Sequence, residues 1–249
     1  MLSATWFRYV SVLRRSPVDT VSMLVRPLVS ALLYFLFAQF YLAGSAGVGY
    51  LCLSLAVVNL VTNAAAGGAF EAKEDTRDDR FDSVLLAPGG LAGFVVAEAL
   101  IQTAIALVES LVVVAIAWPW LRADAAGVAW AVAGTLALCA LCVAWTSVGV
   151  LTTVRSGNTI QVTFVTSLAV TLGGAFWPVE SLPAVLGAVA RVNPLTYPID
   201  LIRASLTGGS YLAEPGIELA VTVGAAVAVG MLAAALMARR RDLSGLARV

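Results

Sequence analysis

Long uncharged stretches of hydrophobic residues dominate the chain, and their lengths predict membrane-spanning helices. The 44 residues 27–70 carry no charge. As one helix they would run about 66 Å, twice the thickness of the hydrocarbon core of a bilayer, so they must fold back. The glycine-rich run 44–49 is the expected turn. Read along the whole chain, the pattern predicts six spans, at about 19–41, 48–70, 91–117, 125–154, 159–177 and 219–237.

An amphipathic pattern precedes the first of these spans. At 100° per residue, one face carries the apolar residues Leu2, Trp6, Tyr9, Val10 and Leu13, and the opposite face carries Arg8, Ser11 and Arg15. A helix with this pattern lies flat in the membrane interface. We therefore expect an interfacial N-terminal helix, with a disordered tail as the alternative.

The connection between the last two spans, 178–218, is too long for a simple loop and contains five prolines. Two short apolar stretches, 182–192 and 196–206, would each form a helix of about 16 Å, half a bilayer. Non-helical backbone is tolerated at membrane depth only where protein or a cavity surrounds it. We predict two re-entrant half-helices joined at Asn193-Pro194. The alternative is an amphipathic flap on the membrane surface.

Composition agrees with the span pattern. The 249 residues are 60% hydrophobic and 12% charged, with a mean hydropathy of +0.93. Soluble domains are about 45–50% apolar and about 25% charged, so a water-soluble globule is excluded. The predicted fold class is an all-α membrane protein with one transmembrane domain, 1–249, and no room for a separate soluble catalytic domain.

The formal net charge of zero hides a strong asymmetry. With both termini placed on one side, 12 of the 15 basic residues fall on that side. Only Arg122, Arg191 and Arg203 fall on the other. Cytoplasmic loops carry the excess of Lys and Arg, so both termini are expected in the cytoplasm.

Missing residue types exclude several kinds of chemistry. The chain has no His, which removes Ser-His-Asp and Cys-His catalysis and most zinc sites. Its single Lys, Lys73, does not follow the glycine that a P-loop requires. Cys52, Cys139 and Cys142 lie in apolar stretches, where we expect buried thiols and neither a disulfide framework nor a metal site. We expect neither an enzyme nor a cofactor in this chain.

The densest charge lies in the predicted inner loop 71–82, with six acidic and three basic residues. Such runs are usually solvated loops. This one is short enough to be helical, and Phe81 with the following Val84 and Leu85 gives it an apolar side. A short charged helix of this kind would suit a groove on a soluble partner.

Acidic residues also lie inside the third predicted span. Glu98 and Glu109 are three helical turns apart and share a face with Gln102. Because a charge near the midplane of a bilayer is costly, these side chains should face the interior of the bundle. They would contact substrate or ions, or they would form interhelical hydrogen bonds.

Two further spans carry polar stripes at helical spacing. These stripes would line a path through the bundle, or they would join neighbouring helices as Ser and Thr commonly do in membranes. With the two acids of the third span, the candidate path residues are Asn59, Thr62, Asn63, Glu98, Glu109, Thr159, Thr163 and Thr166.

Several motifs give the chain a family resemblance. Arg15-Ser16-Pro17 follows the interfacial helix, 177–183 read WPVESLP, and 193–203 read NPLTYPIDLIR. Together with the six spans and the charged inner loop, these motifs resemble the ABC-2 type permeases, the membrane subunits of ATP-binding-cassette exporters. The resemblance extends over nearly the whole chain and is greatest to the drug, antibiotic and nodulation-factor exporters.

The resemblance implies a permease that works in a prokaryotic plasma membrane with a second permease subunit, identical or different. ATP and Mg²⁺ would bind a separate ATPase, and no nucleic acid would be bound. The implied ATPase-coupling residues are Glu71, Lys73, Glu74, Asp75, Arg77, Asp78, Arg80 and Phe81. The implied external gate contains Pro178, Pro183, Asn193, Pro194, Asp200 and Arg203.

The function expected on this basis is ATP-driven export of an amphipathic drug-like, antibiotic-like or lipid substrate. The alternatives are a permease for lipid-linked polysaccharide, or a channel or non-transporting sensor of the same fold. An intramembrane enzyme is disfavoured, because the chain lacks His and any Ser-x-x-Lys motif.

Overall fold

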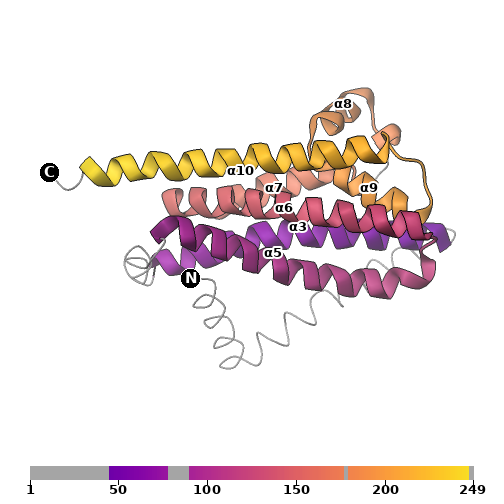
Figure 1. Ribbon diagram of the computed structural model, residues 1–249, viewed down its shortest axis with the longest axis horizontal. Coiled ribbons are helices and arrows are strands. Elements are labelled where there is room, and N and C mark those ends of the chain that lie inside the picture. The colour runs from indigo at the N-terminus through magenta and orange to yellow at the C-terminus, as the bar shows by residue number, and fades with distance from the viewer. Residues whose placement is uncertain (1–44, 78–89, 177–178, 247–249) are drawn as a thin grey trace.

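A computed structural model describes residues 45–77, 90–176 and 179–246. This part of the chain is helical and contains no strand. The long helices run side by side, as Figure 1 shows. The α-helices are α3 (Ser45–Arg77), α5 (Gly90–Ala117), α6 (Ala125–Ser156), α7 (Ile160–Leu172), α8 (Ala184–Val192), α9 (Thr196–Thr207) and α10 (Pro215–Leu246), and the 3₁₀ turns are η1 (Trp118–Trp120) and η2 (Val179–Ser181).

Four of these helices are long and apolar enough to cross a membrane: Val48–Thr76, Gly90–Trp120, Ala125–Ser156 and Pro215–Ala238. They match the predicted spans at 48–70, 91–117, 125–154 and 219–237. The predicted interfacial helix and the predicted first span, 19–41, lie outside the described residues. The count of six spans therefore stays a prediction.

The predicted turn at 44–49 is wrong for the residues that the structure describes, because α3 already begins at Ser45. Gly49 serves packing instead: a Cβ on it would come within 2.9 Å of the Trp120 carbonyl oxygen. The sequence pattern could not separate these cases, since glycine permits both a turn and a close helix contact.

The predicted fifth span is also too long. Helix α7 has 13 residues and ends at Leu172, not at residue 177. Gly173 and Gly174 follow it, and Gly174 has a positive φ of 77°. A backbone turn of this kind ends a helix and favours glycine.

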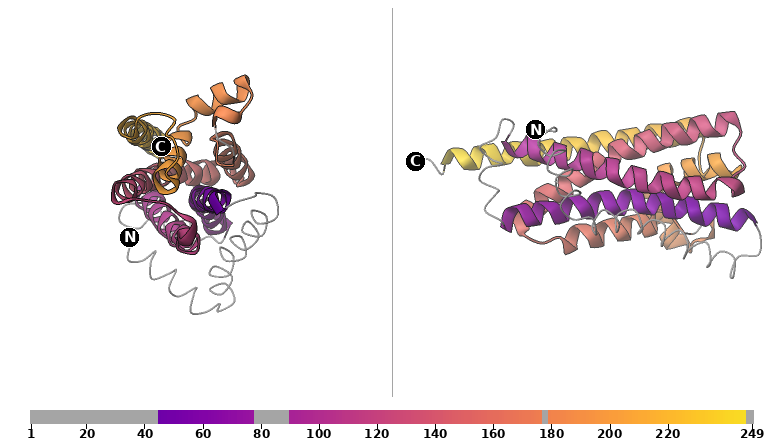
Figure 2. Two further views of the ribbon diagram at one scale, coloured as in Figure 1. Left: turned by 90° about the vertical axis from the view of Figure 1, so that its right-hand side faces the viewer. Right: turned by 90° about the horizontal axis from the view of Figure 1, so that it is seen from below.

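Helix α3 is the most buried of the four long helices, and α10 is the least buried. The apolar window of α3 is 72% buried, against 11% for α10. Helix α3 packs on α5, α6, α7 and α9, whereas α10 packs mainly on α6 and α9. Figure 2 shows α10 at the edge of the described helices in the view along the bundle. Much of the core comes from aliphatic side chains of α3, α6 and α9, among them Leu53, Leu60, Leu138, Leu141 and Ile199.

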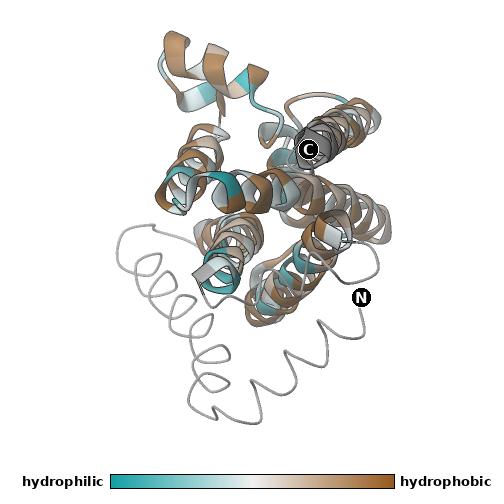
Figure 3. Cartoon of the chain, turned by 90° about the vertical axis from the view of Figure 1, so that its left-hand side faces the viewer, coloured by the Kyte–Doolittle hydropathy of each residue, from teal (hydrophilic) through white to brown (hydrophobic). Residues whose placement is uncertain are grey.

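Hydrophobic residues make up most of the long helices, as the colouring in Figure 3 shows, and many of them are exposed. Large apolar side chains such as Leu136 and Met231 are well exposed, at 65% and 63%. Exposed aliphatic surface of this extent fits contact with lipid.

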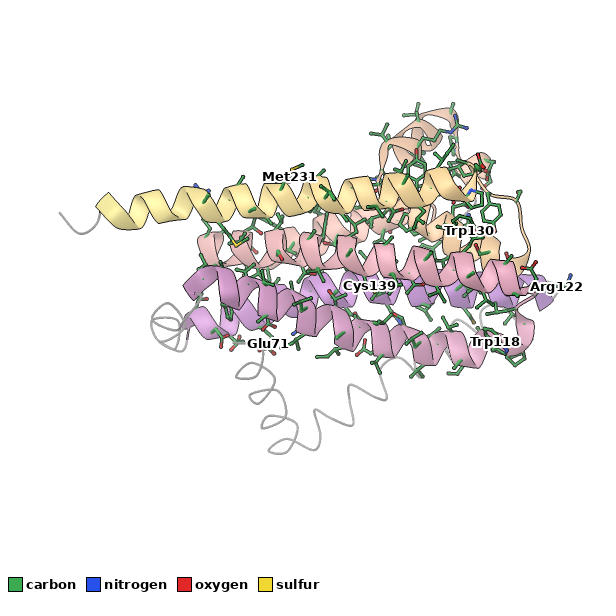
Figure 4. The ribbon with its side chains drawn as sticks, in the orientation of Figure 1. Glu71, Trp118, Arg122, Trp130, Cys139 and Met231 are labelled. Atoms are coloured by element: carbon green, nitrogen blue, oxygen red, sulfur yellow. The ribbon has the colours of Figure 1, made fainter. Side chains whose placement is uncertain are left out.

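The two ends of the bundle differ in chemistry. Figure 4 shows Glu71 near one end and Trp118 with Arg122 at the opposite end. We call these the Glu71 end and the Trp118 end. The C-terminal part of α10 lies at the Glu71 end, whereas α8, α9 and the connection to α10 lie at the Trp118 end. The Arg122 amide, two residues after η1, donates to the Leu206 carbonyl of α9 at 2.9 Å, so the segment between η1 and α6 is bonded to α9 there.

Candidate functional site

The polar residues of α3 and α5 meet across the interface of these two helices. Asn63 Nδ2 on α3 donates to Glu109 Oε2 on α5 at 2.7 Å, and the Glu109 side chain is buried. The structure therefore shows the interhelical hydrogen bond that was one of the two predicted roles of Glu109. A polar bond of this kind fixes one helix against its neighbour.

Glu98 lies on the same face of α5, three helical turns before Glu109, and is completely buried. Its Oε1 accepts from Gln102 Nε2 at 2.9 Å. Gln102 in turn lies against Gly67 of α3, where an added Cβ would overlap its side-chain amide. The prediction that Glu98 and Glu109 face the bundle interior is thus confirmed, whereas the part played by Gly67 was not foreseen. We call Asn63, Glu98, Gln102 and Glu109 the α3–α5 cluster.

Two of the predicted path threonines donate hydrogen bonds to backbone carbonyls one turn earlier in the chain. Thr62 Oγ1 donates to the Val58 carbonyl at 2.6 Å, and Thr163 Oγ1 donates to that of Thr159 at 3.2 Å. Thr166 accepts from Trp145 Nε1 of α6 at 2.9 Å. These bonds satisfy hydroxyl groups inside the bundle, and a place for the same residues along a path stays a prediction.

An open surface groove lies between α7 and α8 and is almost entirely apolar. It is lined by Val165, Leu168, Leu172, Val189 and Val192, among others. No predicted path residue lines it, and Asn193 is the gate residue that reaches it.

Helix α3 continues past the predicted loop boundary, so Glu71–Arg77 are helical. Asp75 is buried, Glu74 is exposed, and Glu71 and Lys73 lie between these extremes. Thr76 Oγ1 donates to the Lys73 carbonyl at 2.7 Å. The structure thus brings five of the predicted coupling residues onto one rigid helical end. The other three, Asp78, Arg80 and Phe81, lie outside the described residues.

A second buried polar group lies at the Trp118 end, centred on two predicted gate residues. Arg203 forms an ion pair with Asp200 one turn earlier on α9. Its Nη1 donates to Tyr50 Oη of α3 at 2.7 Å and to the Gly174 carbonyl at 3.0 Å. The guanidinium carbon lies 4.6 Å from the centroid of the Tyr50 ring. Asp200 Oδ2 accepts from the Leu212 amide at 2.7 Å.

Glu218, in the first turn of α10, completes this group. It is 0% exposed, and its Oε1 accepts from the Ala213 amide at 2.8 Å. Its carboxyl also interacts with that of Asp200. We call Tyr50, Asp200, Arg203 and Glu218 the Trp118-end cluster. The sequence analysis missed Tyr50 and Glu218, although Glu218 stands out as an acid at the start of an apolar span.

The two predicted half-helices, 182–192 and 196–206, are present as α8 and α9, and their junction is tightly bonded. Asn193 Nδ2 donates to the Ala169 carbonyl of α7, and its Oδ1 accepts from the Leu195 amide. Thr196 Oγ1 donates to the Ala190 carbonyl at 2.6 Å. Helix α9 is almost wholly buried, whereas α8 is largely exposed. Whether either helix dips into a membrane stays a prediction.

Two of the three prolines of the predicted gate lie next to the ends of α8. Pro183 is the residue before α8, as expected for a residue that begins a helix without donating a hydrogen bond. Pro194 lies in the α8–α9 junction and is half-buried. Pro178 lies outside the described residues. The described gate residues therefore gather at the Trp118 end, far along the bundle from Glu71–Arg77 (Figure 1).

Comparison with known proteins supports the resemblance of the sequence motifs. No curated protein matches the chain. The family model of the ABC-2 type transporter matches residues 2–207, which contain the α3–α5 cluster, the charged end of α3, and Asp200 with Arg203. An ABC-2 membrane domain is a transport component rather than a catalyst. The chain belongs to the ABC-2 type transporter family.

Proposed function

We propose that the chain is the permease subunit of an ATP-driven exporter for an amphipathic drug-like, antibiotic-like or lipid substrate. Family membership makes it the membrane component of a transporter. The energy would come from a separate ATPase, because the chain has no P-loop lysine. A second permease subunit would complete the transporter.

The observation that carries the proposal is the charged continuation of the central helix. Glu71–Arg77 extend α3 without a break, and α3 packs on α5, α6, α7 and α9. A displacement applied to Glu74 or Lys73 would therefore be transmitted to the middle of the bundle as a rigid-body movement. Packed helices of this kind shift between discrete arrangements, as a two-state transporter requires.

The proposed gate lies at the Trp118 end, opposite the charged end of α3. Helix α9 is buried against α3 and α6, while α8 presents aliphatic side chains such as Val185 and Val192 outward, at 76% and 85% exposure. Movement of α3 would also displace α9, because Arg203 on α9 donates a hydrogen bond to Tyr50 on α3. The route for substrate would run beside α3 and α7, where Asn59, Thr62 and Thr163 are half-buried.

Transport in inside-out vesicles tests the proposal. The permease is co-reconstituted with an ABC ATPase that co-purifies with it, and ATP-dependent uptake of lipophilic fluorescent dyes is measured. Charge reversal at exposed Glu74 (Glu74→Lys) should reduce ATP-driven uptake and substrate-stimulated ATP hydrolysis several-fold without reducing membrane insertion. The matched control is Glu214→Lys, an exposed acid at the opposite end. Equal activity of both variants, or dye uptake without ATP, would overturn the proposal.

A further inference from the structure

Two carboxyl groups and one guanidinium group share the buried space between α9 and α10. Asp200 is paired with Arg203 and accepts from the Leu212 amide, while Glu218 accepts from the next amide, that of Ala213, and is completely removed from solvent. With both acids ionised, this group would carry one uncompensated negative charge. An unpaired charge at a buried position is costly, and two adjacent carboxylates rarely ionise together.

The hydrogen bonds identify which oxygen lacks a partner. Asp200 accepts from Arg203 and from the Leu212 amide, and Glu218 Oε1 accepts from the Ala213 amide. Glu218 Oε2 is buried, and no donor from the described residues reaches it. A carboxylate oxygen left in this way loses a hydrogen bond that water would supply in the unfolded chain.

The surrounding charges do not supply the missing cation. Tyr50 is the titratable group that α3 presents to the cluster, and Tyr211 of the connecting segment is bonded to Ser205 on α9. From η2, Glu180 adds a negative charge near Tyr50. The other described ionic groups at this end, which include Arg122, Asp124 and Glu214, are exposed.

We propose that Glu218 and Asp200 form a proton-binding site that joins α9 to α10. The proton is covalently held on Glu218 Oε2, and this O–H donates to the Asp200 carboxylate, which keeps its charge for Arg203. One proton removes the excess negative charge and satisfies the buried oxygen. The site therefore holds the segment from Leu212 to Glu218 against α9. When the proton leaves to solvent, the two carboxylates repel each other and this attachment weakens.

The sign of the resulting pH dependence follows from proton counting. In the unfolded chain a Glu side chain is ionised at neutral pH, so the folded protein binds one proton more. Stability therefore falls as pH rises through the range in which the site releases its proton. For a chain of this size the loss is about 3 °C in Tm for each pH unit in that range.

The test compares three proteins in lipid nanodiscs: the unmodified chain, Glu218→Gln and Glu214→Gln. Infrared spectra at neutral pH should show the carbonyl band of a protonated carboxylic acid, which Glu218→Gln removes and Glu214→Gln retains. Melting curves should show a fall in Tm at alkaline pH for the unmodified chain and Glu214→Gln. Glu218→Gln should be pH-independent in the same range, because its neutral amide can donate to Asp200 and accept from Ala213.

Several results would overturn the proposal. One is a carbonyl band unchanged in Glu218→Gln, and another is the same pH slope in all three proteins. A Glu218→Gln protein that fails to fold would also contradict it, since the amide reproduces the hydrogen bonds of the protonated acid. Melting is repeated in sodium chloride and in choline chloride. Recovery of the alkaline Tm by sodium alone would assign the site to a metal cation instead.

Discussion

The α3–α5 cluster and the Trp118-end cluster are both buried and polar, yet they join different parts of the molecule. The first links α3 to α5 through side-chain amides and carboxyl groups. The second links α3, the end of α7, α9 and the start of α10, and it contains a guanidinium group and backbone bonds. The first therefore stabilises one helix pair, whereas the second determines how distant segments assemble.

This difference matters for transport. A helix pair joined by Asn63 and Glu109 can move as a unit without losing its internal bond. The Trp118-end cluster cannot survive a separation of α9 from α3, because Arg203 donates to Tyr50 directly. If α9 belongs to the external gate, this cluster is the part that must break or move with it.

The largest expected effect is that of Arg203→Ala. The change leaves Asp200 and Glu218 buried without a cation, and breaking a buried ion pair in this way costs about 3–5 kcal/mol. We expect a large loss of folded protein, measured by thermal unfolding in detergent and by yield of membrane-inserted chain. Arg122→Ala, which removes an exposed cation at the same end, should stay within about 0.5 kcal/mol. Similar stability of both variants would contradict the special role of the cluster.

A smaller loss is expected for Gly67→Ala in the α3–α5 interface. The new Cβ would overlap the Gln102 side chain, and such overpacking costs about 1–3 kcal/mol. The measurement is again the unfolding free energy in detergent. Gly224→Ala on exposed α10 is the control, because its Cβ would meet nothing within 4 Å. A neutral Gly67→Ala would show that the α3–α5 pair is loosely packed.

Tyr50→Phe separates the hydrogen bond of Tyr50 from its ring contact. The ring stays beneath Arg203, and Arg203 Nη1 keeps its bond to the Gly174 carbonyl. We expect a loss of about 0.5–1.5 kcal/mol, the usual contribution of one hydrogen bond. Tyr50→Leu, which also removes the ring, should lose more. Equal losses in the two variants would show that the ring contact contributes nothing measurable.

The smallest structural effect is expected for Glu109→Gln. The amide oxygen can still accept from Asn63, so the unfolding free energy should change by less than about 1 kcal/mol. If Glu109 also contacts substrate, ATP-driven transport of cationic dyes should fall more than that of neutral dyes. Equal transport of both dye classes would limit Glu109 to joining α3 and α5.

Much of the fold follows from local sequence properties. The four long helices lie where uncharged length predicted spans, and α8 and α9 lie where two short apolar stretches predicted half-helices. The shared face of Glu98 and Glu109 also follows from helical periodicity. Helix length and face are properties of contiguous residues, so a single sequence carries them.

Errors arose where one residue type serves two purposes. The glycines near residue 47 indicated a turn, but Gly49 lies inside a helix and permits contact with Trp120. The charged run 71–82 indicated a loop or a short separate helix, and its first part instead prolongs α3. Glycine content alone does not distinguish a turn from a close helix contact. Charge alone does not distinguish a loop from the exposed end of a helix, because charged side chains can contact water in both.

The sequence by itself determined that this protein crosses a membrane more than once, because its long uncharged apolar stretches recur along the chain. The tertiary structure alone decided that Arg203 is buried, that Tyr50 lies beneath it, and that Glu218 joins Asp200. Tyr50 and Arg203 are 153 residues apart, so no local pattern connects them. Their contact exists because helix packing brings α3, α9 and α10 together, and in that buried space charged groups must compensate one another.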